Sequence, residues 1–354
     1  MSMGAPAPLV SVIVVNHNRA ELLSECLRSL AAQTHPCLEI LVVDNASTDA
    51  SRDLVRSASD SRVRLIEADH NLGFGVANNL AASQASGDFF ALLNNDAVAD
   101  PRWIESLVSR VASDPGAGMC ASKILVHGTT VIDKAGHLIY PDGQNRGRGT
   151  GEQDRGQYDQ PGEALFPDGC AALYRRAAWE EVSGFDPHFF AYADDADFGL
   201  RCRLRGWRCL YEPKAVVFHH RSSTSGPYSP TKIYLVERNR FWLAVKSFPW
   251  PLLLVSPVVT LNRWTWNLAA ALLKRGAAGN FRRDQSALAL LAILWRAYRD
   301  GVRGLGPILS ARRTVRTTRS LSDWQLYRLL WRYRISARKL AFQDVEEKDE
   351  GREG

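Results

Sequence analysis

The sequence of 354 residues lacks several features that define common classes of protein. Its six cysteines are scattered without a CxxC pair, which argues against a zinc ribbon and against a disulfide scaffold in a chain of this length. No clean run of about 20 apolar residues is present, because the best candidate, 249–273, contains Pro251, Pro257 and Arg263. The N-terminus has no basic segment ahead of its short apolar run. We therefore expect neither a membrane-spanning helix nor a signal peptide.

Three nucleotide-binding and catalytic signatures are also missing. The sequence contains no GxGxxG, no GxxxxGK(S/T) and no GxSxG. The classes that depend on these motifs are dinucleotide-binding dehydrogenases, P-loop enzymes and α/β-hydrolases. All three classes therefore lose their main support.

Positive charge is concentrated in one part of the chain. The formal net charge is +6, but residues 274–340 hold sixteen Lys and Arg against three acidic residues. The tail 341–354 holds two basic and six acidic residues, and residues 1–273 are mildly acidic. A basic C-terminal part suits an anionic partner, either nucleic acid or an anionic membrane. Because the N-terminal part is acidic and no nucleic-acid-binding motif is present, we expect no nucleic-acid partner.

Strands and helices are predicted to alternate along the first hundred residues. Apolar, β-branched runs predict buried strands at 10–15, 39–43, 63–66 and 88–93. Amphipathic or small-residue segments predict helices at 21–33, 47–57 and 75–86. This order indicates an α/β fold with a mostly parallel sheet flanked by helices. Ligands of such sheets bind beyond the carboxyl ends of the strands. Asn16, Asp44 and Asp96 each follow a strand, so we expect them along one edge.

The remainder of the chain is less regular. Residues 128–162, rich in Gly, Asp, Gln and Arg, predict a long irregular insertion. Further elements are expected as helices at 176–182 and 198–205 and as strands at 208–211 and 215–218. From residue 231 the sequence predicts helices rich in Trp, Leu and Arg. We therefore place a domain boundary near residue 230.

Asp96 is a candidate metal ligand. It follows an apolar strand and the amides Asn94 and Asn95. Mg²⁺ and Mn²⁺ often bind through one or two carboxylates together with phosphate oxygens of a substrate. Asn-Asn-Asp is also ordinary turn chemistry, so this motif alone leaves both interpretations open.

A second acidic cluster follows Tyr192 and consists of Asp194, Asp195 and Asp197. Three carboxylates so close together repel one another unless a cation, a proton or a helix N-terminus compensates. One interpretation is acidic residues that cap the helix predicted at 198–205. The other is a carboxylate with a raised pKa that acts as a general base.

Two further motifs lie near the same edge. His219 and His220 end a predicted strand, where a histidine can contact a metal or a phosphate, although a lone histidine is more often structural. The Gly73–Gly75 segment with Asn78 is GxG-like but is too weak alone to indicate a phosphate-binding loop.

With these residues in place, the chain resembles the family 2 inverting glycosyltransferases of the GT-A fold, and most of all their bacterial rhamnosyltransferase branch. The matching segments are VSVIVVNHNR (10–19), LEILVVDNASTD (38–49), NLGFGVANN (71–79), GDFFALLNNDAV (87–98) and GFDPHFFAYADDADFGLRCRLRGWRCLYEPKAVVFHH (184–220). They occur in the order and spacing of the family and span roughly residues 9–240.

The resemblance implies where the substrate that donates the sugar, a nucleotide sugar, binds. Asp44 matches the aspartate that binds the nucleotide base, and Asn16 lies in the loop that receives the nucleotide. Asn78 is also assigned to nucleotide binding. Asp96 matches the last residue of the DxD-type motif, which binds Mg²⁺ or Mn²⁺ and the diphosphate. His219 or His220 matches a histidine near that metal. Because the motif is reduced here to one carboxylate, we expect modest metal affinity.

The resemblance also implies which residues carry the chemistry. Asp195 matches the second acidic residue of the family's Glu-Asp pair, the presumed base. Asp194 stands where the family usually has Glu, which leaves open which of the two takes the proton. Asp168 and Gly169 resemble the loop beneath the donor sugar, and Asp197 is a further candidate contact of the donor or acceptor sugar.

The C-terminal part is rich in tryptophan as well as arginine. Seven of the ten tryptophans lie at or beyond Trp242, interleaved with Arg-bearing segments. This pattern is typical of helices that lie in a membrane interface. A purely structural helical bundle is the alternative. The resemblance favours the membrane, because it implies an acceptor linked to polyprenyl diphosphate.

Together these inferences predict a catalytic domain at 1–230, a basic membrane-surface region at 231–340 and an acidic, disordered tail at 341–354. The expected activity is metal-dependent, inverting transfer of a sugar, with dTDP-rhamnose as the favoured donor. The expected acceptor is a glycan or a polyprenyl-diphosphate-linked glycan of the cell wall or surface polysaccharide. The expected location is cytoplasmic, at the inner face of the cell membrane. A sugar nucleotidyltransferase and a catalytically inactive GT-A scaffold remain the alternatives.

Overall fold

The structure is a computed structural model that describes residues 7–221, 229–273, 275–276 and 286–343. Its strands are β1 (Val10–Asn16), β2 (Leu38–Asp44), β3 (Val63–Glu67), β4 (Phe89–Leu93), β5 (Ala97–Ala99), β6 (Ala117–Val126), β7 (Ile132–Lys134), β8 (His137–Ile139), β9 (Asn145–Gly147), β10 (Gly162–Glu163), β11 (Ala171–Arg175) and β12 (Arg208–His219). All but β8 and β9 belong to one sheet, whose path runs β10-β12-β6-β11-β4-β1-β2-β3.

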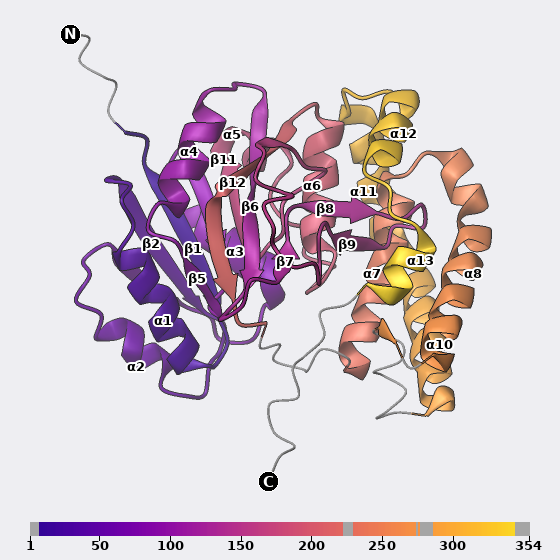
Figure 1. The fold of residues 1–354 in the computed structure, drawn as a ribbon, viewed down its shortest axis with the longest axis horizontal. Helices are drawn as coiled ribbons and strands as arrows, with labels where there is room; N and C mark the ends of the chain where they lie inside the picture. The colour runs from indigo at the N-terminus through magenta and orange to yellow at the C-terminus, as the bar shows by residue number, and fades with distance from the viewer. Residues whose placement is uncertain (1–6, 222–228, 274, 277–285, 344–354) are drawn as a thin grey trace.

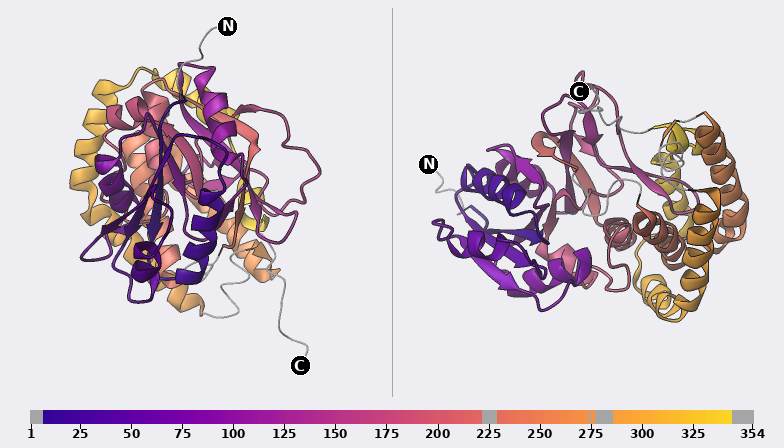
Figure 2. Two further views of the ribbon diagram at one scale, coloured as in Figure 1. Left: turned by 90° about the vertical axis from the view of Figure 1, so that its left-hand side faces the viewer. Right: turned by 90° about the horizontal axis from the view of Figure 1, so that it is seen from below.

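Helices cover both faces of this sheet and also form a separate group at one end of the molecule (Figures 1 and 2). Those that accompany the sheet are α1 (Ala20–Ala31), α2 (Ser51–Arg56), α3 (Gly73–Gln84), α4 (Trp103–Ala112), α5 (Arg176–Glu181) and α6 (Asp194–Leu204). The C-terminal group consists of α7 (Pro230–Ser247), α8 (Trp250–Leu272), α10 (Ala287–Arg303), α11 (Leu305–Thr318), α12 (Asp323–Arg332) and α13 (Ala337–Phe342).

The sheet is parallel in its N-terminal half. β1 pairs in parallel with β2 and β4, and β2 pairs in parallel with β3. β11 enters between β4 and β6 and is antiparallel to both. The predicted α/β fold is confirmed, and the carboxyl ends of β1, β2 and β4 meet at one edge.

Alternation along β1 explains why its apolar run is continuous. Val12 and Val14 lie in a core cluster with residues of α1 and α4, whereas Ile13 lies in a second cluster with residues of α3 and α6. Successive side chains of a strand point to opposite faces of the sheet. A strand covered by helices on both sides therefore needs apolar residues at every position.

The structure corrects three predicted elements. The 128–162 segment is not wholly irregular, because it contains β7 and the β8–β9 hairpin. The two strands expected at 208–211 and 215–218 are one strand, β12, with a register shift between Glu212 and Val216. Pro213 lies within that shift and cannot donate a ladder hydrogen bond. Helix α6 begins at Asp194, so the acidic cluster forms its first turn.

The C-terminal helices share a core with residues that precede them in the chain. Phe189 and Leu200, from before and within α6, cluster with Trp242 of α7, Ile308 of α11 and Leu326 of α12. The sequence correctly predicts helices after residue 230. Residues 344–354, most of the tail predicted to be disordered, lie outside the described residues.

A buried ionic network joins α7, α8 and the loop after β8. Arg263 donates from Nη1 to Glu237 Oε1 at 2.8 Å and from Nε to Asp142 Oδ2 at 2.8 Å. Arg240 adds a hydrogen bond from Nε to Glu237 Oε2 at 2.9 Å. Because these charges are removed from water, each would destabilise the fold if its ionic partners were lost. The arginine that interrupts the longest apolar segment of the sequence thus has a structural role.

Helix α8, with 23 residues, is the longest helix of the described part of the chain, and Pro257 lies within it. Across the ranges that the structure describes, none of the helices combines the length and the apolar character needed to cross a bilayer.

We expect Arg263→Ala to lower the free energy of unfolding by about 3–5 kcal/mol, because two buried carboxylates lose a cationic partner. Urea denaturation measures this change. Arg299→Ala is the matched control, since Arg299 pairs with Asp300 at the surface and should change the free energy of unfolding far less. Equal losses of unfolding free energy in the two variants would contradict the structural role of Arg263.

Candidate functional site

Asn16 ends β1 and is fully buried. Its Oδ1 accepts a hydrogen bond from Asn95 Nδ2 at 2.7 Å, and its Nδ2 donates to Ser47 Oγ at 3.2 Å. Asn16 is also paired in register with Asp44 at the end of β2. The side chain therefore fixes the two loops that follow β2 and β4 relative to each other.

Asp44 has one satisfied and one open carboxylate oxygen. Oδ1 accepts hydrogen bonds from Ser47 N at 3.0 Å and from Arg52 Nε at 2.7 Å. Burial opposes ionisation, but these hydrogen bonds outweigh it and lower the pKa of Asp44 below its ordinary value. Oδ2 is buried and has no hydrogen-bond partner. An ionised carboxylate with a free acceptor oxygen can receive an N–H group of a ligand.

Asn78 lies in α3 and is 1% exposed. Its Nδ2 donates to the carbonyl oxygen of Phe74, one turn earlier in the same helix, at 2.9 Å. This hydrogen bond of the amide nitrogen therefore stays within α3. The predicted role in nucleotide binding stays a prediction.

Asp96 and His219 form the centre of the predicted metal site. His219 Nε2 lies 3.2 Å from Asp96 Oδ1, and His219 Nδ1 lies 2.8 Å from Asp133 Oδ2. Burial disfavours the imidazolium, yet Cys170, and next the hydrogen bonds to Asp133 and Asp96, raise the pKa of His219 well above its ordinary value. Metal-binding histidines commonly have a carboxylate on their second nitrogen, which fixes the ring. Asp96 and His219, supported by Asp133, thus fit a divalent metal.

His220 points away from this pair. Its Nε2 lies 3.0 Å from Glu25 Oε2 on α1, and its ring stacks on that of His127 with centroids 3.8 Å apart. Consecutive residues at a strand end face opposite sides. Of the two histidines that the sequence left open, His219 is the one whose side chain contacts the carboxylate of Asp96.

Asp168 lies between two cationic or hydrogen-bonding groups. Its Oδ2 is 2.7 Å from Lys134 Nζ and 2.8 Å from His137 Nε2. Burial opposes ionisation, but Lys134 and His137 hold the pKa of Asp168 well below its usual range. Asp168 and His137, together with Asp195, offer ligand atoms within 4.8 Å of one another. Lys134, which pairs with Asp168, already places a positive charge beside these three side chains.

Asp195 is the more accessible of the two adjacent aspartates. Its side chain is 15% exposed, whereas Asp194 is buried. Asp195 Oδ2 accepts a hydrogen bond from Gly169 N at 3.2 Å. A side chain at position 169 would place its Cβ only 2.9 Å from the ring of Phe74, which explains the glycine. Burial raises the pKa of Asp195, and His137 counteracts this effect.

The segment before α6 has an unusual backbone conformation. Phe190, Tyr192 and Ala193 all have positive φ angles, which non-glycine residues adopt at a cost. Asn239 of α7 lies beneath this segment and is fully buried. Its Nδ2 is 2.8 Å from each of the carbonyl oxygens of Phe189, Ala191 and Tyr192. A C-terminal helix therefore helps to position Asp194 and Asp195.

Asp197 lies in a different environment from Asp195. It is fully buried, and its carboxylate pairs with Arg201 at 2.7 Å and with Lys246 at 2.8 Å. Arg201 lies one turn further along α6, and Lys246 joins α6 to α7. The structure thus gives Asp197 a role in packing, and we leave it out of the proposed sugar-binding site.

Sequence reasoning missed four residues that complete the site: Asp133, Lys134, His137 and Asn239. The first three lie in the segment predicted to be irregular. A signal was present there, because VIDKAGHLIY at 131–140 places three ionisable residues within an otherwise mostly apolar run. Asn239 belongs to a polar stretch of α7, and nothing in its sequence context reveals its contacts.

The chain is similar to known proteins in sequence and in fold. Residues 11–183 match the family model described as Glycosyl transferase family 2. The chain is 30% identical over 253 residues to the O-antigen biosynthesis protein RfbC of Myxococcus xanthus, an alignment that covers 69% of this chain and 19% of that protein. The chain therefore spans only about a fifth of the length of that relative.

A second relative is covered almost completely. The N-acetylglucosaminyl-diphospho-decaprenol L-rhamnosyltransferase of Mycobacterium tuberculosis is 26% identical over 268 residues, which cover 66% of this chain and 86% of that protein. Its length is thus close to that of the present chain.

Solved structures show the same fold. The mannosyltransferase PcManGT from Pyrobaculum calidifontis, in complex with GDP-Man and Mn²⁺, superimposes with a TM-score of 0.53 at 20% identity over 92% of this chain and 88% of that one. GalNAc-T7 with UDP, GalNAc and Mn²⁺ gives a TM-score of 0.55 at 14% identity over 69% of this chain and 48% of that one. The chain therefore carries a glycosyltransferase family 2 domain and has the GT-A fold.

Proposed function

We propose that the protein is a metal-dependent, inverting glycosyltransferase that uses Asp195 as its general base. The observation that carries this proposal is the arrangement of two separate carboxylates at one sheet edge. Asp96, with His219, suits a divalent metal and a diphosphate. Asp195 is partly exposed, has a raised pKa and is hydrogen-bonded to Gly169. Asn94 N donates to Cys170 O at 2.8 Å, which ties the turn before Asp96 to the segment that contains Gly169, the hydrogen-bond donor to Asp195.

In the proposed reaction Asp195 accepts the proton of an acceptor hydroxyl as its oxygen attacks the anomeric carbon of the donor sugar. The bond between that carbon and the diphosphate oxygen breaks, and a nucleoside diphosphate leaves from the opposite face. Asp44 holds the nucleotide base, and the site orients both substrates and excludes water. Asp96 and His219 would hold Mg²⁺ or Mn²⁺, which would supply positive charge to the leaving diphosphate.

The favoured donor is dTDP-rhamnose, and the favoured acceptor is a glycan or a polyprenyl-diphosphate-linked glycan of the cell wall or surface polysaccharide. The support comes from the mycobacterial relative, whose name describes a rhamnosyltransferase that acts on a decaprenol-linked sugar, and from the Myxococcus relative, named for O-antigen synthesis.

The experiment that tests this function incubates the protein with dTDP-rhamnose and with UDP-sugars, in Mg²⁺ or Mn²⁺, with and without a polyprenyl-diphosphate-linked acceptor. We expect release of dTDP that depends on the metal and increases with acceptor. Release of inorganic diphosphate from a nucleoside triphosphate and a sugar phosphate would instead identify a nucleotidyltransferase. No turnover of any donor, with nucleotide still bound, would support the inactive scaffold.

Asp195→Asn should reduce transfer by roughly 10²–10⁴-fold, the usual contribution of a general base, and leave donor binding within about threefold of wild type. Single-turnover transfer and nucleotide titration measure the two effects. Asp194→Asn is the matched control, since its side chain is adjacent but buried. If Asp194→Asn causes the larger loss of transfer, the assignment of the base is wrong.

The same control variant predicts a change in stability with pH. Burial, and next the charge of Asp195, raise the pKa of Asp194 above its ordinary value. Folding therefore opposes the ionisation that the unfolded chain undergoes near pH 4. Asp194→Asn, which carries no charge, should have nearly the wild-type melting temperature at pH 4 and a higher one at pH 8. An equal difference at both pH values would contradict the raised pKa.

The proposed location is the cytoplasmic face of the cell membrane. Exposed apolar residues form one stripe along α8, at Leu254, Val258, Leu261 and Leu268, and another along α10, at Leu288, Leu291 and Trp295. The spacing of three, four and seven residues places each stripe on one helix face. Apolar side chains next to the basic C-terminal sequence suit an anionic bilayer surface.

The C-terminal helices share a core with α6, so their removal would expose that core. A truncated protein would therefore not test the membrane location. We instead expect the double variant Leu254→Glu and Leu261→Glu to lose most binding to vesicles of anionic lipid in a sedimentation assay, with donor turnover retained. Ala58→Glu with Gln84→Glu adds the same charge at exposed positions of the catalytic half and should still bind. Equal binding by the two double variants would refute the membrane surface.

A further inference from the structure

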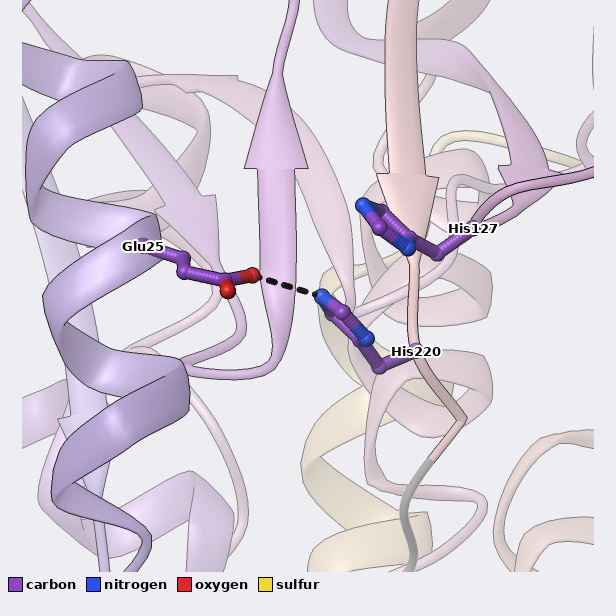
Figure 3. A group of neighbouring side chains, drawn as sticks. All are labelled: Glu25, His127 and His220. Carbon is purple, nitrogen blue, oxygen red and sulfur yellow. Dashed lines mark hydrogen bonds and ion pairs between the residues drawn. The ribbon is translucent and has the colours of Figure 1, made fainter.

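A second group of metal-ligating side chains lies beside the donor site. It consists of Glu25 from the middle of α1, His127 from the turn after β6, and His220 directly after β12 (Figure 3). His220 Nε2 is 3.0 Å from Glu25 Oε2. The rings of His127 and His220 stack with an interplanar angle of 20°. Each residue offers one ligand atom, and these atoms lie within 4.8 Å of one another.

This group is distinct from the Asp96–His219 pair but is connected to it through the backbone. His220 N donates to Asp96 O at 2.9 Å, and His127 N donates to His219 O at 3.0 Å. The side chains of His219 and His220 have different partners, Asp96 and Asp133 for the first and Glu25 for the second. The two groups are therefore neighbours with separate sets of ligand atoms.

The ligand types suit a different ion from that of the donor site. Two imidazoles and one carboxylate are a common set for Zn²⁺ and other late transition metals, whereas Mg²⁺ prefers oxygen ligands. Zn–N and Zn–O distances near 2.1 Å place tetrahedral ligand atoms roughly 3.4 Å apart. His220 Nε2 and Glu25 Oε2, at 3.0 Å, are already close to this spacing.

The remaining ligand can move into place. His127 is exposed, and Glu25 and His220 are partly exposed, so their side chains can adjust without disturbing the core. Three protein ligands at the surface also leave a fourth position for water.

We propose that Glu25, His127 and His220 form a second metal site, which binds Zn²⁺ in preference to Mg²⁺ or Mn²⁺. Binding would join the side chains of α1, the turn after β6 and the end of β12, which now meet in one hydrogen-bonded pair and one ring stack. Since β6 and β12 already pair in the sheet, the new link is mainly that of α1 to this pair of strands. Because the backbones of His127 and His220 bond to those of His219 and Asp96, the ion also stabilises the main chain beneath the donor site.

The test measures Zn²⁺ binding by equilibrium dialysis of the full chain with the donor site saturated by Mn²⁺. Wild type should bind one equivalent of Zn²⁺, and His127→Ala and Glu25→Gln should each weaken that binding at least tenfold. His188→Ala is the matched control, since His188 is an exposed histidine that pairs with Asp186 instead. It should bind Zn²⁺ as the wild type does.

A second measurement separates the two sites. Asp96→Asn should retain the Zn²⁺ equivalent, and Zn²⁺ should raise the melting temperature of the wild type and of Asp96→Asn but not that of His127→Ala. Loss of the Zn²⁺ equivalent in Asp96→Asn, or undiminished binding in His127→Ala, would overturn the proposal. Neither readout depends on transfer of a sugar, so the proposed function can fail while this site is retained.

Discussion

The site depends on the neutralisation of several carboxylates that the fold brings together out of water. Asp96, Asp133 and Asp168 are all buried, and each lies beside His219, Lys134 or His137. The pKa values of Asp133 and Asp168 are lowered despite burial because Lys134 lies near both. Burial raises the pKa values of Asp194 and Asp195, and His137, whose Nε2 lies 3.9 Å from Asp195 Oδ2, only partly offsets this for Asp195. One sheet edge thereby carries carboxylates with lowered pKa values and others with raised pKa values.

The N-terminal half of this arrangement could be predicted because its signals are local. The strand ends at Asn16, Asp44 and Asp96 follow from apolar runs and from the rule that parallel strands present their carboxyl ends at one edge. The structure bears out that placement. The resemblance to a known family pointed to Asp195, and the geometry adds that Asp195 is more exposed than Asp194.

The rest could not be predicted, because it depends on contacts between distant segments. Asp133 and His137 come from short strands whose pairing with β6 and β9 is set by tertiary structure. The choice between His219 and His220 is a matter of which strand face each side chain takes. Asn239 is more than forty residues from the backbone that it supports. No periodicity in the sequence carries such information.

The hydrogen bonds of Asn239 have a consequence for how such enzymes can be recombined. Phe74 N, at the start of α3, also bonds to Phe190 O at 2.7 Å, so the loop before Asp194 is held by the nucleotide side of the sheet and by α7 at once. A chimera that joined the sheet of one relative to the helices of another would separate these two supports. Specificity could be exchanged between relatives only if the 189–193 loop and α7 were transferred as one unit.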